Sequence, residues 1–398
     1  MLVSQSLSET IKRLATEQGF DLAGIAPVGE FAELEYFPKW IASGRAGEMK
    51  YLEARDDQGE LKRASLRAVA PWARSVIVCA INYNTAELYS TQVRDTERGW
   101  ISRYAWSQED YHASLLRRLR VVEQKLLELV QRGRQDAVPT AGGTPALHLH
   151  GDQAVNPQLQ TRCYVDTGPL VERVYAKYAG VGWIGKNTCI LNQKIGSWLF
   201  LGVILTSLEL TPDIPAPDRC GTCTRCLDAC PTNAFNGPYQ LDSNKCISYL
   251  TIEKRGTIPE DSRAGMGRHV FGCDICQDVC PWNRKAPTTT ATEFQPREGL
   301  VNPALDWLAE MEAENFRAVF RGSPIRRAKL AGLRRNAIIA MGNSGNVKFI
   351  PTLEKLCDDG DAVLADSARW AARRLAKARR REHFATGPVR QTRDANPR

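Results

Sequence analysis

Eight of the twelve cysteines lie between residues 220 and 280, and their spacing constrains this chain more than any other feature. The first group, Cys220–Pro231, follows the pattern C-x2-C-x2-C-x3-C-P. The second group, Cys273–Pro281, repeats the end of this pattern, but Val270 stands where the leading cysteine is expected. A separate cysteine, Cys246, lies upstream of the second group and can replace the missing one.

This spacing is typical of bacterial proteins with two 4Fe-4S clusters, in which the cysteine before proline ligates the cluster of the other group. With Cys246 as the displaced ligand, the spacing predicts two sets of four. The set for cluster 1 is Cys220, Cys223, Cys226 and Cys280, and the set for cluster 2 is Cys230, Cys246, Cys273 and Cys276. Zinc sites usually combine two C-x2-C pairs, and disulfides are disfavoured in a chain without a secretory signal. Two clusters form an electron relay, so another part of the chain must use the electrons.

The chain has 398 residues, which allows two or three domains. Its N-terminus lacks the basic segment and the long apolar core of a signal peptide. The longest apolar run, Trp198–Leu205, is too short to span a bilayer. We therefore expect a cytoplasmic protein that has no membrane contact and is a monomer.

The net charge of +8 is concentrated near the C-terminus. Residues 321–398 hold 18 Lys and Arg against 7 Asp and Glu, whereas the remaining 320 residues hold 35 against 38. Concentrated positive charge is typical of a surface that binds a polyanion. A solvated helical surface with a basic tail would give the same count, so charge alone leaves both interpretations open.

A repeated pattern in this basic region predicts paired helices. The spacing of leucine, a small polar residue and two alanines in Leu333–Ala340 recurs in Leu364–Ala371. Small residues at packing positions, with this period, are typical of a short HEAT-like solenoid. We expect helical repeats over residues 300–381 that pack on the rest of the chain, followed by a disordered basic tail over residues 382–398.

The first 210 residues combine helical and strand patterns, and we expect an α/β domain there. Buried strands are predicted at residues 20–27, 75–81 and 198–206, and helices at residues 6–20 and 114–132. Residues 133–160 are rich in Gly, Pro and polar residues and are predicted to form a flexible insertion. A proline-rich segment from residue 211 begins the cluster domain, which we place at residues 211–287.

Asp166 is the most prominent acid of this first domain because it follows a predicted strand and precedes Thr-Gly-Pro. Pro169 is expected near the first position of the next helix. Asp166 could present its carboxyl group to a substrate or could only cap that helix. The glycine-rich stretch Gly182–Cys189 lets the backbone approach a ligand closely.

In combination, these features resemble the epoxyqueuosine reductase family over residues 6–381. The resemblance is carried by the cysteine layout with Cys246, by Val165–Pro169 followed by Gly182–Cys189, and by Arg334–Ala337 in the helical tail. It implies an α+β multidomain chain: an N-terminal α/β cobalamin-binding domain (1–210), a ferredoxin-like domain with two 4Fe-4S clusters, and C-terminal HEAT-like helical repeats.

The resemblance also implies a reaction and its residues. The family uses base-off cobalamin to reduce the epoxide of epoxyqueuosine at the wobble position of tRNA, with electrons from an external low-potential donor. Asp166 would be the proton donor. The implied cobalamin contacts are Tyr104, Asp166, Asn187 and Ser248. The basic repeats would bind the tRNA substrate through Arg326, Arg327, Lys329, Arg334 and Arg335.

Two other classes of protein share parts of this pattern. A cobalamin-dependent reductive dehalogenase of small organohalides would usually carry a twin-arginine export signal and would not need a basic helical tail. A simple electron carrier would not need Asp166 or the Gly182–Cys189 stretch. Binding of tRNA would separate both from a tRNA-modifying reductase.

Overall fold

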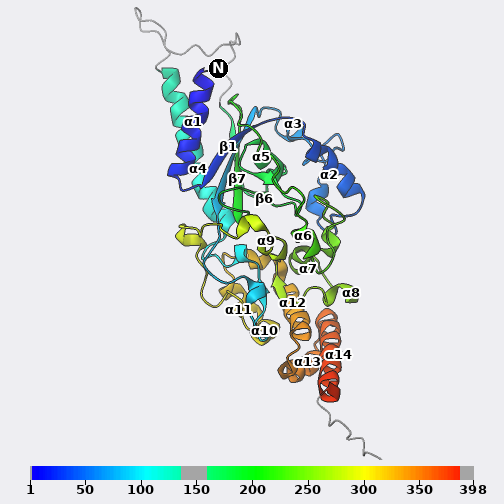
Figure 1. The fold of residues 1–398 in the computed structure, drawn as a ribbon. Coiled ribbons are helices and arrows are strands. Elements are labelled where there is room, and N and C mark those ends of the chain that lie inside the picture. Colours follow the sequence, from blue (N-terminus) through cyan, green and yellow to red (C-terminus); the bar gives the residue numbers. More distant parts are fainter. Residues whose placement is uncertain (1, 136–158, 386–398) are drawn as a thin grey trace, which may run out of the picture.

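The computed structural model describes residues 2–135 and 159–385, which form a sheet-based part and two mainly helical parts (Figure 1). The strands are β1 (Leu22–Pro27), β2 (Ser75–Asn82), β3 (Trp100–Ile101), β4 (Thr161–Tyr164), β5 (Trp183–Ile184), β6 (Ile190–Leu191), β7 (Leu199–Thr206) and β8 (His269–Phe271). The helices are α1 (Leu2–Glu17), α2 (Ala32–Ala42), α3 (Leu66–Val69), α4 (Tyr111–Gln135), α5 (Glu172–Tyr178), α6 (Arg225–Asp228), α7 (Ile247–Ile252), α8 (Glu260–Arg263), α9 (Ile275–Asp278), α10 (Leu305–Ala309), α11 (Ala313–Val319), α12 (Lys329–Ser344), α13 (Ile350–Leu356) and α14 (Ala362–Ala385).

The main sheet has the strand order β1-β2-β7-β4, and every neighbouring pair is antiparallel. The strands predicted from apolar runs are confirmed as β1, β2 and β7. Helices cover both faces, as the prediction of an α/β domain requires. The antiparallel pairing, however, departs from the parallel sheet that βαβ units build. The first domain is therefore an antiparallel sheet between helical layers.

Two hydrophobic clusters cover the two faces of this sheet. The cluster on one face includes residues of α1 and α4, and the cluster on the other face includes residues of α5. All eight residues of β2 are buried because this strand is central and covered on both sides. Gly24 in β1 permits close packing of the end of α5, since a Cβ there would lie 1.9 Å from the Ala179 carbonyl oxygen.

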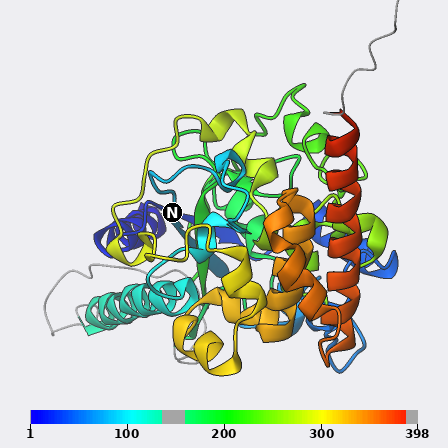
Figure 2. The ribbon, with the colours of Figure 1, turned by 90° about the horizontal axis from the view of Figure 1, so that it is seen from below.

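The C-terminal helices share one core with the cluster region rather than forming a core of their own. This core contains residues of the segments 101–106, 247–271 and 300–375. This shared core confirms that the C-terminal helices pack on the rest of the chain. It also joins the predicted domains 211–287 and 300–381 into one packed unit. The repeated positions are buried between α12 and α14, which lie side by side (Figure 2). No helix within the described ranges is long and apolar enough to cross a membrane.

Two predicted flexible segments fall largely outside the described residues. Of the predicted insertion 133–160, residues 136–158 are not described, and residues 133–135 continue α4. Of the predicted tail 382–398, residues 386–398 are not described. Residues 382–385 belong to α14, so the prediction of disorder is wrong for these four residues.

Arg335 holds α12 against the cluster region and is not a surface residue. Its side chain is buried, with 1% of its surface exposed. The guanidinium donates hydrogen bonds to the carbonyl oxygens of Leu250 (2.9 Å), Lys254 (3.0 Å) and Gly256 (2.6 Å). Burial lowers its pKa to about 10. The interpretation of Arg335 as a tRNA contact is therefore wrong, because its hydrogen-bonding groups are used inside the fold.

This arrangement predicts a large stability effect at Arg335. Hydrogen bonds to a charged group contribute about 1.5–3 kcal/mol each, and losing the guanidinium leaves several buried carbonyls without a donor. We expect Arg335→Met to lower the free energy of unfolding by about 3 kcal/mol or more, measured by thermal and urea unfolding. Arg321→Met, at an exposed position, should change it by less than about 0.5 kcal/mol. Equal stability of the two variants would contradict the role assigned to Arg335.

Candidate active site and cluster ligands

Asp166 lies on a strained turn after β4. Its φ angle is +56°, a left-handed conformation that is uncommon for a residue with a side chain. The backbone N–H of Asp166 donates a hydrogen bond to Glu172 Oε1 (2.8 Å), which fixes the turn. The next helix, α5, begins only at Glu172, and no side chain caps its N-terminus. Asp166 therefore does not cap this helix. Pro169 lies three residues before Glu172, so the prediction of Pro169 near the first helical position is also wrong.

The Asp166 carboxylate has polar partners from the start of α4. The Tyr111 hydroxyl donates a hydrogen bond to Asp166 Oδ2, and His112 Nε2 lies 3.6 Å from the same oxygen. The other ring nitrogen of His112, Nδ1, lies 2.8 Å from Asp110 Oδ1. About half of the Asp166 side chain remains exposed, so the carboxylate is held in place and still open to a ligand.

These contacts shift the proton equilibria of the neighbouring groups. Burial raises the pKa of Tyr111 well above its usual value, and the negative charge of Asp166 raises it further. Burial alone would lower the pKa of His112, but the hydrogen bond and charge of Asp110 and the charge of Asp166 outweigh it and raise this pKa. Burial, and then the charge of Asp166, raises the pKa of Glu172 well above its usual value. The sequence pattern did not single out any of these partners.

In the first predicted set, the thiols influence one another electrostatically. Burial raises the pKa of Cys226 to about 11, and the thiolate charges of Cys220, Cys223 and Cys280 contribute to this rise. In the described part of the chain, no three Cys, His, Asp or Glu side chains are grouped tightly enough for a single metal ion. The two sets stay a prediction from the cysteine spacing, and the electrostatic effects among the thiols agree with it.

The second set forms in the same way around Cys246. Burial raises the pKa of Cys273 well above its usual value, and the charges of Cys246 and Cys230 add to this effect. The pKa of Cys276 is also raised, first by a hydrogen bond with Cys189, then by burial, and by charges that include Cys273 and Cys246. Cys246 precedes the first residue of α7, so that helix fixes its position. Cys189 is a further thiol at this site that the spacing did not reveal.

Besides Asp166, two of the predicted cobalamin contacts have neighbours at this site: Tyr104 packs against Tyr111, which bonds to Asp166, and Ser248 follows Cys246. The Tyr104 ring packs 6.0 Å from both Tyr111 and Phe271, between centroids. Burial, and then the negative charges of Asp274 and Asp166, raises the pKa of Tyr104. Ser248 is half-buried and lies two residues after Cys246.

The fourth predicted contact, Asn187, is used inside the fold. Its side chain is buried, its amide donates to the Cys276 carbonyl oxygen (3.2 Å), and its oxygen accepts from the Cys189 N–H (3.2 Å). Asn187 therefore supports the cluster-2 loop. A half-exposed carboxylate, an aromatic hydroxyl and a serine beside a cluster ligand fit a large cofactor with a polar edge, so the remaining three positions suit cobalamin.

The predicted tRNA-binding cations fall into two groups. Arg326 and Lys329 are exposed and form no ion pair among residues 2–135 and 159–385. Arg327 pairs with Glu253 (2.9 Å), and its positive charge weakly opposes the protonation of His112. Arg334 is half-buried, donates to the Ala309 carbonyl oxygen (2.7 Å) and pairs with Asp359 (2.9 Å). Arg334 therefore shares the structural role of Arg335.

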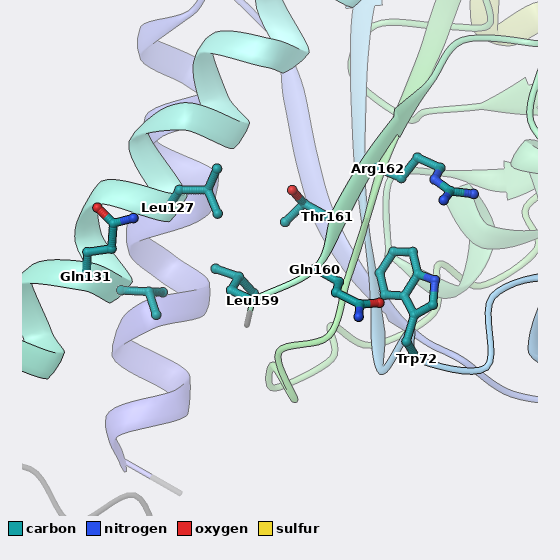
Figure 3. A pocket seen from close by; sticks show the side chains of 8 residues that line it. Trp72, Leu127, Gln131, Leu159, Gln160, Thr161 and Arg162 are labelled. Atoms are coloured by element: carbon teal, nitrogen blue, oxygen red, sulfur yellow. The ribbon is translucent and has the colours of Figure 1, made fainter. Parts of the chain in front are cut away.

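A cavity of about 460 Å³ lies away from this site (Figure 3). It separates Leu127 and Gln131 of α4 from Trp72 and Arg162, whose guanidinium lies 5.9 Å from the Trp72 ring centroid. These residues stand at the end of α4 and the start of β4, whereas Tyr111 and Asp166 stand at the opposite ends. None of the candidate site residues lines this cavity.

Comparison with known proteins assigns the family. A profile described as epoxyqueuosine reductase QueG, DUF1730, matches residues 63–167, and a profile for a 4Fe-4S double cluster binding domain matches residues 219–283. The epoxyqueuosine reductase of Synechocystis sp. is 43% identical over 319 residues, which cover 79% of this chain and 98% of the relative. This chain belongs to the epoxyqueuosine reductase family. The predictions of the family and of iron-sulfur binding are confirmed.

Solved structures of this family superpose over almost the whole chain. An epoxyqueuosine reductase in complex with an epoxyqueuosine-modified tRNA-Tyr stem loop has a TM-score of 0.77 and 27% identity, covering 97% of this chain and 96% of that chain. An epoxyqueuosine reductase from Bacillus subtilis, described with its catalytic aspartate loop swung out of the active site, has a TM-score of 0.74 and 28% identity. It covers 94% of this chain and 94% of that chain.

The ligand role of Cys246 can be tested by counting iron. If Cys246 belongs to the second set, Cys246→Ala should lower the iron content from about eight to about four per chain, because one cubane loses a ligand. The reduced variant should show the EPR signal of one remaining cluster. Cys357→Ala, at a cysteine outside both sets, should retain both clusters. Full iron content in Cys246→Ala would rule out the displaced-ligand assignment.

Proposed function

We propose that this protein reduces the epoxide of epoxyqueuosine, at the wobble position of tRNA, to queuosine. Two electrons and two protons convert the epoxide into a carbon–carbon double bond and water. The observation that carries the proposal is the half-exposed Asp166 on its strained turn, with its carboxylate held by Tyr111 and His112. The relatives named epoxyqueuosine reductase and the relative bound to a modified tRNA stem loop support this substrate.

The cofactors of the reaction are two 4Fe-4S clusters and cobalamin. The eight cysteines from Cys220 to Cys280 would hold the clusters, with electrons entering from an external donor. Base-off cobalamin would be held by Tyr104, Asp166 and Ser248, and when bound it supplies a reduced cobalt that is strongly nucleophilic towards strained carbon. The protein then has to orient the epoxide and deliver protons to the departing oxygen.

Asp166 is suited to deliver the proton. Its left-handed turn directs the carboxyl group away from β4, and the hydrogen bond from its N–H to Glu172 keeps the turn in place. Tyr111 and His112 fix the orientation of the carboxyl oxygen Oδ2. Because the pKa of His112 is raised, this ring stays protonated to a higher pH and can return a proton to Asp166 after turnover. The catalytic aspartate loop described for the Bacillus subtilis enzyme supports an acid in this role.

The exposed cations near the site would bind the tRNA backbone. Arg326, Arg327 and Lys329 lie within or directly after the short helix η7 (Pro324–Ala328). Arg327 acts electrostatically on His112, so this segment borders the opening in which the modified base would lie. Phosphate contacts from Arg and Lys position a nucleic acid without reading its sequence, which suits an enzyme that recognises one modified base.

The role of Asp166 predicts a specific kinetic defect. Asp166→Asn keeps the shape of the side chain and can accept the Tyr111 hydrogen bond, but it cannot donate a carboxylic proton. We expect it to retain both clusters, cobalamin and tRNA affinity, and to convert the epoxide roughly 10²–10⁴ times more slowly. The measurement is single-turnover conversion under a chemical reductant, read by mass spectrometry of digested tRNA. If the fully loaded variant converted the epoxide at the wild-type rate, Asp166 would not be the proton donor.

The tRNA surface predicts a change in salt dependence. Arg326→Glu/Lys329→Glu should weaken tRNA binding and lower the slope of log affinity against log salt by about two, because fewer counterions are released. Turnover on the free epoxyqueuosine nucleoside should change much less. Arg74→Glu/Arg132→Glu, at exposed positions beyond the far end of the sheet, provides a control with the same change of charge. If both double variants bound tRNA with equal affinity at every salt concentration, the surface with Arg326 and Lys329 would not be the tRNA-binding surface.

A further inference from the structure

Three of the most exposed large hydrophobic side chains gather around the first cysteine set. Ile214, Leu88 and Tyr239 are 88%, 63% and 40% exposed. Ile214 lies two residues before Ala216, which packs with Cys220 and the buried Cys280. Exposed apolar side chains that cluster on a polar surface mark an interaction site.

The contacts of the other two side chains place them at the same cysteines. The Tyr239 hydroxyl donates to Asp218, whose other carboxylate oxygen accepts a hydrogen bond from the Cys220 N–H (2.7 Å). Leu88 lies three residues before Thr91, whose hydroxyl donates to Asp278 Oδ2 (3.2 Å), and Asp278 lies two residues before Cys280. The three side chains therefore belong to three chain segments that each contact the loops carrying the first set.

An open hollow lies on this face between the two helices that follow the C-x2-C pairs. Its volume is about 510 Å³, and α6 and α9 contact each other beneath it. It is lined by Arg225, Asp228, Ala229, Asp278, Val279 and Arg284. Ala229 and Val279 directly precede Cys230 and Cys280, so the floor of the hollow is the polypeptide that holds both cysteine sets.

Unpaired cations form the rim of this face. Lys186, Lys194, Arg219, Arg225, Arg284 and Lys285 take part in no ion pair within the described residues. Lys186 donates to the carbonyl oxygens of Gly221 (2.7 Å) and Cys223 (3.0 Å), and it therefore lies directly over the cysteine loop. Three acids lie among them, and Asp218, Asp228 and Asp278 are each engaged by a neighbouring hydroxyl. Glu87, directly before Leu88, is a fourth acid, so six cations against four acids leave this face with an excess of positive charge.

We propose that this face, defined by Leu88, Ile214, Tyr239, Arg225 and Arg284, is the docking surface for a small acidic protein that carries a low-potential one-electron group. An apolar centre inside a charged rim is the usual composition of a protein–protein interface. Tyr239 and Ile214 would form the centre, and the cations would attract the acidic partner. Redox encounters bury little surface, so a patch of this extent is sufficient. A tRNA phosphate backbone is charged, so it would not bind an exposed isoleucine at the centre of this face.

This inference rests on the proposed function because that reaction needs electrons from outside the chain. Each docked carrier molecule gives up one electron at this face and leaves one-electron oxidised. Two such encounters supply both electrons, and two protons from water complete the conversion of epoxide to alkene and water. The modified base would enter near Asp166, beside Arg326 and Lys329, so carrier and tRNA would occupy separate surfaces.

The test uses the cluster-loaded full chain and flavodoxin as the acidic carrier. Stopped-flow absorbance follows cluster reduction by flavodoxin hydroquinone, and calorimetry measures the affinity for oxidised flavodoxin. Arg225→Glu/Arg284→Glu should lower both the bimolecular rate and the affinity by about tenfold or more at low ionic strength, with a smaller loss at high salt. Ile214→Asp should weaken binding at all salt concentrations, since it removes the apolar centre and adds repulsion.

Two controls make the result specific to docking. Arg74→Glu/Arg132→Glu carries the same change of charge on exposed residues of the sheet part and should behave as wild type. Photoreduced 5-deazariboflavin is small and uncharged, and it should reduce the clusters of every variant at the wild-type rate. Epoxide conversion by the wild-type protein with deazariboflavin as the reductant tests the proposed function without a protein carrier. A failure of the proposed function can therefore be distinguished from a failure of the docking proposal.

Unchanged flavodoxin rates and affinities in Arg225→Glu/Arg284→Glu and Ile214→Asp would overturn the proposal. The proposal would also be contradicted if reduction by deazariboflavin slowed by the same factor as reduction by flavodoxin. The substitutions would then affect the clusters and not the docking of the carrier. Loss of tRNA affinity with normal flavodoxin reduction would identify the face as a nucleic-acid surface instead.

Discussion

The arrangement of this protein depends on the exchange of cysteines between two chain segments. In the assignment favoured by spacing and by the mutual effects of the thiols, each cluster takes three cysteines from one part of the region and one from the other. The segment Cys220–Cys230 and the segment Cys273–Cys280 can therefore complete their sites only together. Their helices α6 and α9 pack against each other, Cys273 and Ile275 pack on the core shared with the C-terminal helices, and Cys280 packs with Trp183 and Leu191.

The catalytic chemistry is built where these parts meet. The sheet supplies the Asp166 turn at the end of β4, and α4 supplies Tyr111 and His112 at its first residues. The cluster region supplies Cys246 and Ser248, which are proposed to hold a cluster and cobalamin. The C-terminal helices hold this region in place from behind, because Arg335 and Asn336 of α12 bind the backbone carbonyls of residues 250–256 and 270. The basic segment next to α12 then lies close to the opening, so one helix both supports the site and positions the proposed tRNA contacts.

The sequence predicted the features that depend on local pattern. Apolar runs predicted β1, β2 and β7, and cysteine spacing predicted the two groups of thiols, including the displaced Cys246. It did not reveal Tyr111, His112 and Glu172 as partners of Asp166, because their contacts join separate elements through tertiary packing. It also predicted that Arg334 and Arg335 bind tRNA, since a count of charges cannot distinguish a buried guanidinium from an exposed one. The local sequence pattern also did not predict the antiparallel pairing of the sheet or the core that the cluster region shares with the C-terminal helices. Both features depend on contacts between residues that are distant in the sequence.

The central claim is that cofactor, clusters and acid occupy one site beside Cys246 and Asp166. EPR of cob(II)alamin bound to the anaerobic, cluster-loaded protein tests this most directly. A base-off cofactor loses the nitrogen splitting of its cobalt lines, and a reduced cluster close to cobalt broadens them. We expect both effects in the wild-type protein and no broadening when the second cysteine set has lost its cluster. An unbroadened spectrum with nitrogen splitting intact would show that cobalamin does not bind at this site.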